Sequence, residues 1–367
     1  MNLVYDNERK LFKLMLAWSL LVWGAVLVLT VGLALVYALF AFLLYCFVQS
    51  ALISYIKGNG VRITEEQFPD LKRQVASCCR KLGLDDEPQA YLLQMGGMLN
   101  AFATRFLGRD FLVLYSDVVD GLADNPDALN FYIGHEIGHI KRKHLHWATV
   151  LMPATALPLI GAAYARAREY TCDRHGLAAC DDPRNAEHGL AVLAAGGKRA
   201  QAMNHRAYVE QARQTEGFWM SFHELVNDYP WLVKRMAAVR ALAAGHELRQ
   251  PARNKLAGLL ALCVPRMGVG GGAGAVVPVF VIALFAAIAI PAYKGYQQRA
   301  QQQAIVQAMQ DVDTALAAAD AAERTAQEEE QDQGAQDQGV QAEAAQDEAA
   351  PAGAVTPRGR ASIPSAR

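Results

Sequence analysis

A run of 43 consecutive residues without a formal charge, from Leu14 to Ile56, constrains this chain more than any other feature. A bilayer core takes about 20 apolar residues per helix, so the run fits two membrane-spanning helices with a turn near residues 30–32 better than one strongly tilted helix. A cleaved signal peptide fits poorly, because its apolar part is much shorter and ends at a small-residue cleavage site. We expect residues 1–60 to form a membrane anchor, in the form of a two-helix hairpin.

Basic residues flank this anchor on both sides. The positive-inside rule places both flanks in the cytoplasm, which requires an even number of crossings and therefore agrees with a hairpin. We predict a multi-pass protein of the cell inner (cytoplasmic) membrane. The flanking residues are Arg9, Lys10 and Lys13 before the run, and Lys57 and Arg62 after it.

The remainder of the chain divides by composition. A folded domain is expected over residues 61–255, a glycine-rich linker over 256–275, a further transmembrane helix over 276–293, and an Ala/Gln/Glu-rich tail, largely disordered, over 294–367. The fold class that follows is mainly α with a small β-sheet plus transmembrane helices. Within the folded domain we expect a helix from Thr64 to Leu82, strands at Ala90–Leu93 and Phe111–Tyr115, and a helix from Asp124 through His144.

Charge and cysteine usage exclude several classes of protein. The formal net charge is −1 and no basic face is present, so nucleic acid is not an expected partner. The six cysteines include no C-x-x-C pair and are too few for a disulfide scaffold. They are expected to be buried small side chains in a reducing compartment.

The pentapeptide His135-Glu136-Ile137-Gly138-His139 matches H-E-x-x-H on a predicted helix. Residues four apart share a helix face, so His135 and His139 can bind one metal ion, and Glu136 lies beside it. The alternative is a solvated helix that happens to carry histidines, and the polar stretch at residues 141–146 is compatible with it. We predict a zinc site.

A catalytic zinc requires a third protein ligand and one open position. Glu169, thirty residues after His139, can supply that ligand from a second helix. Asp173 follows one turn later, where its carboxylate could accept the free ring N–H of a liganding histidine and fix the tautomer of that ring. Taken alone, the Glu169 and Asp173 spacing is also that of a surface pair.

These motifs resemble those of the gluzincin membrane metallopeptidases, which include the heat-shock protease HtpX and the CAAX prenyl endopeptidases. The resemblance covers residues 61–245 and is only partial near Tyr229, where the family usually has histidine. The matching segments are Asn100–Ala103, similar to the family's N-A-F edge-strand motif, His135–His139, Ala165–Asp173, and Tyr229-Pro230-Trp231 with Arg235.

The resemblance implies a zincin-type α+β protease domain with one Zn²⁺ per chain, endopeptidase activity and an active site that faces the cytoplasm. Glu136 would take a proton from the attacking water and pass it to the leaving nitrogen. The oxyanion donor stays open among Tyr229, His223 and Arg235.

The same resemblance implies a role for the edge-strand motif and a class of substrate. Asn100, Ala101 and Phe102 would bind an extended peptide by strand addition, although Asn100 fits a strand-end position equally well. The expected partners are a protein or peptide substrate, membrane-embedded or membrane-associated, and the lipid bilayer. Protein quality control is one role that this implies.

The competing interpretation is a catalytically inactive membrane scaffold or assembly protein with a protease-like fold. It draws on residues 280–296, which resemble the end of the N-terminal helix of type IV pilins. A plain transmembrane helix explains that segment more simply. The complete ligand set with its base favours catalysis.

One apolar run poses a topological problem. The 18 residues Trp147–Tyr164 are long enough to span a bilayer. A single crossing would separate Glu169 from His135 and His139, and two crossings need about 40 residues. Pro153 and Pro158 also interrupt a straight helix. We predict a buried or membrane-dipping segment beside the active site.

Overall fold

The structure is a computed structural model that describes residues 2–96 and 100–264, together with residues 291, 293–319, 321–322 and 324–325. It separates into two units, Met1–Ala283 and Leu284–Arg367. In the second unit residues 293–319 are helical. Most of the predicted linker, nearly all of the predicted span over 276–293, the pilin-like segment up to residue 290 and the tail after residue 325 lie outside the described residues.

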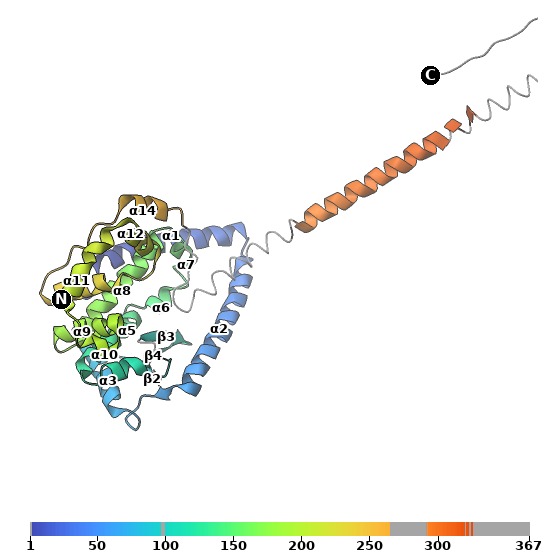
Figure 1. The fold of residues 1–367 in the computed structure, drawn as a ribbon. Coiled ribbons are helices and arrows are strands. Elements are labelled where there is room, and N and C mark those ends of the chain that lie inside the picture. Colours follow the sequence, from blue (N-terminus) through green and yellow to red (C-terminus); the bar gives the residue numbers. More distant parts are fainter. Residues whose placement is uncertain are drawn as a thin grey trace, which may run out of the picture. The chain divides into compact units, whose positions relative to one another are not determined.

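The first unit is mainly helical with one small mixed sheet (Figure 1), which agrees with the predicted fold class. The strand order is β1-β2-β4-β3, in which β2 and β4 run parallel and the other pairs antiparallel. Strand β3 is therefore an edge strand. The elements are α1 (Asp6–Leu29), α2 (Ala34–Asn59), β1 (Val61–Arg62), α3 (Pro69–Leu82), β2 (Gln89–Leu93), β3 (Ala101–Phe106), β4 (Arg109–Tyr115), α4 (Ser116–Gly121), α5 (Pro126–Lys141), α6 (His144–Trp147), α7 (Met152–Thr155), α8 (Ile160–Ala179), α9 (Pro183–Ala195), α10 (Gly197–Ala200), α11 (His205–Glu210), the 3₁₀ helix η1 (Gln211–Glu216), α12 (Phe218–Val226), α13 (Leu232–Ala243) and α14 (Lys255–Ala261).

Two helix boundaries differ from the predictions. Helix α3 begins at Pro69 rather than Thr64, because the Thr64 hydroxyl accepts the N–H of Gln67 in a turn that precedes the helix. Helix α5 ends at Lys141 rather than His144, because Lys143 adopts a left-handed conformation with φ 56°. The chain turns there, and His144 starts the separate helix α6.

Helices α5 and α8 pack against each other at the centre of the first unit because glycines line their interface. A Cβ atom on Gly134 would lie 2.5 Å from the Cβ of Ala179, and one on Gly176 would lie 2.6 Å from the carbonyl oxygen of Phe131. Neither position has room for a side chain. This close approach brings the histidines of α5 within reach of the carboxylates of α8.

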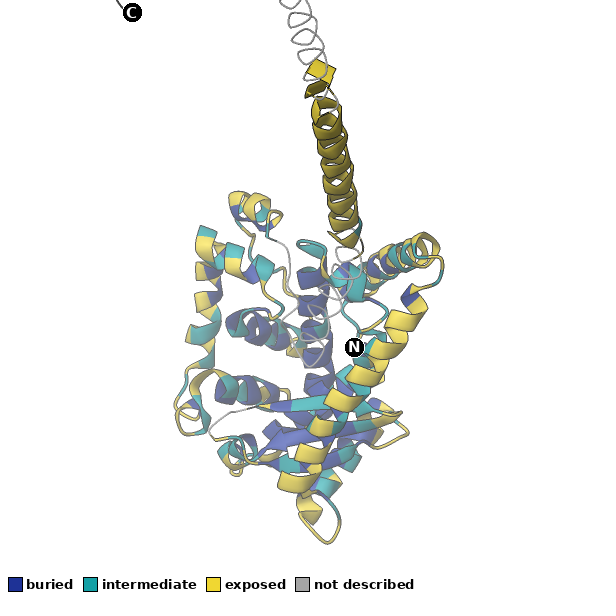
Figure 2. Ribbon diagram, turned by 90° about the vertical axis from the view of Figure 1, so that its right-hand side faces the viewer, coloured by how far each residue is buried: buried dark blue, intermediate teal, exposed yellow. Residues whose placement is uncertain are grey.

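The long apolar run forms the two predicted helices, α1 and α2, joined by a turn in which Gly32 has φ 81°. The helices diverge from that turn and do not pack along each other as the predicted hairpin would (Figures 1 and 2). Helix α1 packs on α7 and α8, whereas α2 contacts β2 and β3. Each helix buries its own stripe on the rest of the unit, including Met15 on α1 and Ile56 on α2.

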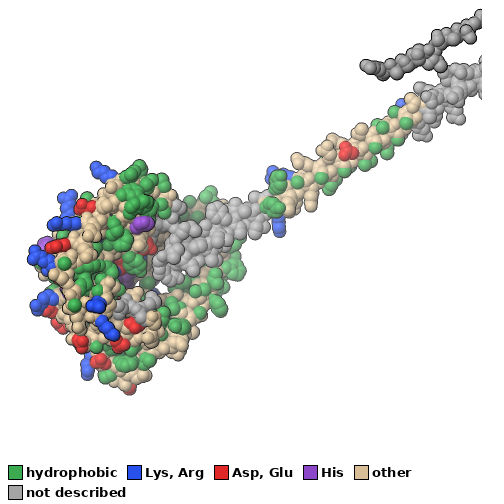
Figure 3. Space-filling model, in the orientation of Figure 1, with side chains coloured by type: hydrophobic (Ala, Val, Ile, Leu, Met, Phe, Trp, Pro, Cys, Tyr) green, Lys and Arg blue, Asp and Glu red, His purple; other side chains and the backbone are tan. Residues whose placement is uncertain are grey.

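Most residues of α1 and α2 are nevertheless exposed, and most of the exposed ones are apolar. Leu39 is 56% exposed and Phe47 is 74% exposed. Figure 3 shows hydrophobic side chains along α2, whereas the Lys and Arg side chains of the unit that are visible in this view lie mainly on its opposite side. By length and composition each helix could cross a membrane.

The apolar run Trp147–Tyr164 forms no continuous helix. It comprises α6, α7 and the start of α8, with Pro153 in the first turn of α7 and Pro158 just before α8. It packs against α1, where Met15 joins a buried cluster with Leu151. The broken, packed segment agrees with the topological prediction.

Candidate metal centre

Two histidines from α5 and one carboxylate from α8 converge. Nε2 of His135 lies 3.5 Å from Oε2 of Glu169, and Nε2 of His139 lies 3.6 Å from Oε1 of the same residue. The Glu169 side chain is 7% exposed, His135 10% and His139 18%. The three predicted ligands therefore surround one point with their donor atoms.

These separations suit one small tetrahedral ion. Ligands at about 2.0–2.2 Å from a tetrahedral zinc lie about 3.4 Å from one another. Both histidines also turn Nε2 inward and offer Nδ1 to another polar group, which is the arrangement of metal-bound histidines. The residues present thus fit a zinc ion held by His135, His139 and Glu169.

The Nδ1 side of His135 is fixed by an ion pair behind it. Nδ1 of His135 lies 3.0 Å from Oδ1 of Asp173. Arg235, from α13, donates to both oxygens of that carboxylate, from Nε at 2.8 Å and from Nη2 at 2.6 Å. Asp173 therefore lies where a residue that orients His135 must lie, and Arg235 holds Asp173.

The ionisable groups of this site are coupled to one another. Burial opposes protonation of His135, but its hydrogen bonds to Asp173 and Glu169 raise the pKa of the ring to about 9, so a metal ion that binds Nε2 would displace a proton. Burial alone would raise the pKa of Glu169, but hydrogen bonding and charge from His135, with Arg235, lower it to about 2. Burial likewise opposes ionisation of Asp173, yet Arg235 lowers the pKa of that carboxyl to about 2. Burial lowers the pKa of His139 well below its usual range, so its ring is neutral and can donate a lone pair.

Glu136 follows His135 on α5 and is 9% exposed. Burial raises the pKa of its carboxyl to about 7, and a backbone hydrogen bond from Ala103 on β3 partly opposes this rise. A carboxylate with a pKa near neutrality suits a general base.

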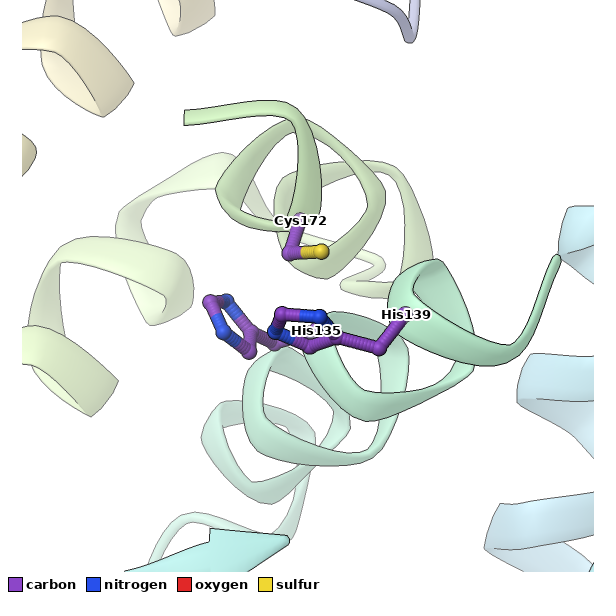
Figure 4. Close-up of side chains that lie close together, drawn as sticks. All are labelled: His135, His139 and Cys172. Atoms are coloured by element: carbon purple, nitrogen blue, oxygen red, sulfur yellow. The ribbon is translucent and has the colours of Figure 1, made fainter. Parts of the chain in front are cut away.

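Cys172 is an additional donor that the sequence did not single out. Its sulfur and one nitrogen from each of His135 and His139 all lie within 4.8 Å of one another (Figure 4). Burial, followed by the charges of Glu169 and Glu136, raises the pKa of this thiol well above its usual range. A bound zinc ion would deprotonate a coordinating thiol, so the choice of the third ligand rests on distance. Glu169 lies 3.5 and 3.6 Å from the two Nε2 atoms. The geometry favours Glu169 as the third ligand.

The Nδ1 side of His139 faces a second chain of polar groups. Nδ1 of His139 lies 3.0 Å from Nδ1 of His144, and Nε2 of His144 lies 3.2 Å from Oε1 of Glu8. Arg142 donates to the same Glu8 oxygen from Nε at 3.2 Å and Nη2 at 3.1 Å. His144 and Glu8 are 2% and 1% exposed.

The three suggested oxyanion donors lie in different settings. Tyr229 is 53% exposed, and the charge of Glu169, followed by burial and the charge of Glu136, raises the pKa of its phenol. Its hydroxyl is therefore protonated and within electrostatic reach of both carboxylates. Arg235 donates to Asp173 from Nε and Nη2, and its Nη1 lies 3.5 Å from Oε2 of Glu169. His223 stacks on Trp219 on α12.

The predicted substrate segment lies on or beside the edge strand. Ala101 and Phe102 belong to β3, and Asn100 precedes it with its carbonyl accepting the N–H of Tyr115. In an antiparallel ladder alternate residues bond to the partner strand, so the backbone groups of Ala101 and Ala103 face away from β4. The hydrogen bond between Ala103 and Glu136 points the same way. This edge of β3 therefore borders the histidine helix.

Glu8, His144 and Cys172 are site residues that the sequence reasoning missed. His144 had one available signal, its position five residues after His139, but it was interpreted as part of a polar helix end. Glu8 is an acidic residue in a basic flank, and no local pattern connects it to a site 136 residues away.

Two comparisons with known proteins found metallopeptidases. Residues 65–163 match the model of peptidase family M48, a range that includes His135, Glu136 and His139 and ends before Glu169. Over 173 residues the chain is 28% identical to the plastoglobule-localized metallopeptidase 48, chloroplastic, of Arabidopsis thaliana. The matched region covers 42% of this chain and 49% of that protein. The chain thus spans about half the length of this curated relative. No solved structure matches.

Proposed function

We propose, starting from the similarity of residues 65–163 to peptidase family M48, that this chain is a membrane-bound zinc metalloendopeptidase of the gluzincin type. The observation that carries the proposal is the placement of Glu169, whose two oxygens lie 3.5 and 3.6 Å from the inward nitrogens of His135 and His139. A surface histidine helix would have no reason to bury such a set.

A zinc ion bound there would polarise the scissile carbonyl and acidify the attacking water. Glu136 then takes the proton of that water and delivers it to the leaving nitrogen. The Tyr229 hydroxyl donates to the oxygen on which negative charge develops. The outward backbone groups of β3 bind the peptide in an extended form that lies beside Glu136.

The substrates we propose are membrane proteins or proteins held at a membrane. Support comes from α1 and α2, whose exposed apolar side chains suit a lipid environment better than water. We place the protein in the cell inner (cytoplasmic) membrane, with the active site facing the cytoplasm. A role in protein quality control fits substrates of this kind.

The decisive experiment separates metal binding from proton transfer. His135→Ala, His139→Ala and Glu169→Ala should each lose zinc and all hydrolysis of a casein substrate. Glu136→Gln keeps the three ligands, so it should retain one zinc per chain while hydrolysis falls by about 10²- to 10⁴-fold. Metal analysis and casein cleavage by the detergent-purified chain provide the measurements. Full activity in Glu136→Gln would exclude the mechanism, and a wild type that binds zinc without cleaving would favour the scaffold alternative.

A further inference from the structure

Each of the two histidines has a buried carboxylate paired with an arginine behind it, but the two supports come from different parts of the chain. For His135 the support is Asp173 with Arg235, both within the protease domain. For His139 it is Glu8 with Arg142, and it acts through the intervening ring of His144. Glu8 belongs to the first turn of α1, the candidate membrane helix.

The proton positions along this chain follow from the geometry. A histidine that offers the lone pair of Nε2 to a metal carries its proton on Nδ1. The Nδ1–H of His139 then donates to Nδ1 of His144, which must be the unprotonated nitrogen of that ring. His144 accordingly carries its proton on Nε2 and donates it to the carboxylate of Glu8. Each contact in the chain then has one donor and one acceptor.

We propose that Glu8 and His144 are positioning residues of the metal centre, and that the start of α1 thereby helps to hold His139 in its metal-binding orientation. This inference rests on the proposed zinc site.

The segment before Glu8 keeps that carboxylate in place. The backbone N–H of Tyr5 donates to the Thr171 hydroxyl at 3.0 Å, and Arg174 donates to the carbonyl of Asn2 at 3.0 Å while its guanidinium lies over the Tyr5 ring. Thr171 and Arg174 are on α8, the helix that carries Glu169 and Asp173. The N-terminal segment is therefore attached to the helix that supplies the third ligand.

Arg142 offers a simpler reason for Glu8 to be buried, since the two residues form an ion pair. That pair would stabilise the fold without any effect on the metal. The distinguishing property of the proposed chain is that Glu8 acts on His139 only through His144. Its effect on zinc binding must therefore disappear when His144 can no longer transmit it.

The test uses the full chain in detergent with the variants Glu8→Gln, His144→Phe and the double variant. Zinc affinity is measured by competition with a chelator, and the apoprotein is followed by thermal unfolding. Glu8→Gln and His144→Phe should each weaken zinc binding by about 10- to 100-fold. The double variant should bind zinc no more weakly than His144→Phe alone. The visible spectrum of the cobalt-substituted protein should shift in both single variants.

Glu247→Gln is the matched control. Glu247 forms an ion pair with Arg174 at 2.9 Å, and Arg174 contacts the same N-terminal segment. The variant therefore removes a carboxylate near this segment, and Glu247 makes no contact with His144 among the described residues. Its zinc affinity should equal that of the wild type. Because Glu8→Gln conserves volume, its comparison with this control is decisive even if His144→Phe unfolds at a lower temperature.

Two outcomes would overturn the inference while leaving the zinc site intact. One is wild-type zinc affinity in Glu8→Gln, and the other is an additive loss in the double variant. A wild-type chain that binds no zinc would overturn the proposed function together with this inference.

Discussion

Helices α5 and α8 bury charged and polar side chains, whereas helices α1 and α2 expose apolar ones. On α8, Glu169 and Asp173 are 5% and 2% exposed. On α2, Leu39 and Phe47 are 56% and 74% exposed. A soluble protein of ordinary composition shows the reverse on both counts.

The two helix pairs solve opposite solvation problems. Buried carboxylates are tolerated beside α5 because each has a cationic or histidine partner, as Asp173 has in Arg235. Exposed leucines are tolerated on α2 if lipid replaces water around them. The buried charges of α5 and α8 therefore reflect the proposed metal site, whereas the exposed apolar side chains of α1 and α2 reflect the proposed lipid environment.

The largest effect should come from protonating the buried base of α5. The pKa of Glu136 is raised to about 7 by burial, so the carboxyl is protonated and unable to accept a proton below that pH. We expect kcat/KM at pH 5 to be about 100-fold lower than at pH 8. Casein hydrolysis across pH 5–9 measures this. A rate independent of pH over that range would show that Glu136 is not the base, and Glu136→Gln should lack the acidic limb.

Removing the charge of Asp173 from its buried ion pair with Arg235 tests whether this pair supports metal binding. Asp173→Asn keeps the size of the side chain but loses its charge and its ion pair with Arg235. Zinc affinity should fall by about 10- to 100-fold without being abolished. Chelator competition measures the affinity, and Asp181→Asn, an exposed carboxylate beyond the end of α8, is the control. An unchanged affinity would return Asp173 to a purely structural role.

The close approach of α5 and α8 can be tested by adding a methyl group between them. A Cβ on Gly176 meets the backbone oxygen of Phe131 at 2.6 Å, so Gly176→Ala should lower the free energy of unfolding by about 1–3 kcal/mol. Gly58→Ala on α2 adds the same methyl group where nothing lies within 4 Å. Thermal unfolding should show no loss of stability in that control. Equal effects of both changes would contradict the tight α5–α8 interface.

The smallest effect is expected on the exposed face of α2. Leu39→Ala should change the free energy of unfolding in detergent by less than about 0.5 kcal/mol. Leu190→Ala, at a core position that is 1% exposed, should cost about 2–5 kcal/mol. Denaturant unfolding compares the two. A large loss for Leu39→Ala would mean that α2 packs against protein at that position.

The site predictions that the structure supports came from the spacing of residues within single helices. His135 and His139, like Glu169 and Asp173, are separated by one helical turn, so a pattern of four residues was enough to place each pair on one helix face. The structure brings Glu169 to the inward nitrogens of both histidines and Asp173 to Nδ1 of His135. The helical fold with a small sheet followed from the same periodicities.

Tertiary contacts supplied what the sequence could not. The approach of Glu8 to His144 depends on the break at Lys143, whose left-handed backbone no residue preference at that position predicts. The divergence of α1 from α2 depends on which surface each helix finds in the folded unit. Helix α3 shows that a local sequence signal can also mislead. Thr64 was predicted to start this helix, but it forms a turn, and the helix begins at Pro69.

The attachment of residues 2–8 to α8 has a consequence for the biosynthesis of the protein. Tyr5 and Thr171 are separated by 166 residues, so a ribosome that adds about 5–20 residues per second needs roughly 10–30 s to make the partner after the N-terminal segment has emerged. Arg142 and His144 follow Glu8 by 134 and 136 residues, so Glu8 has neither residue beside it when the apolar part of α1 emerges. If α1 enters a bilayer, as proposed, it can do so before the metal centre is complete and before the chain can cleave a substrate there.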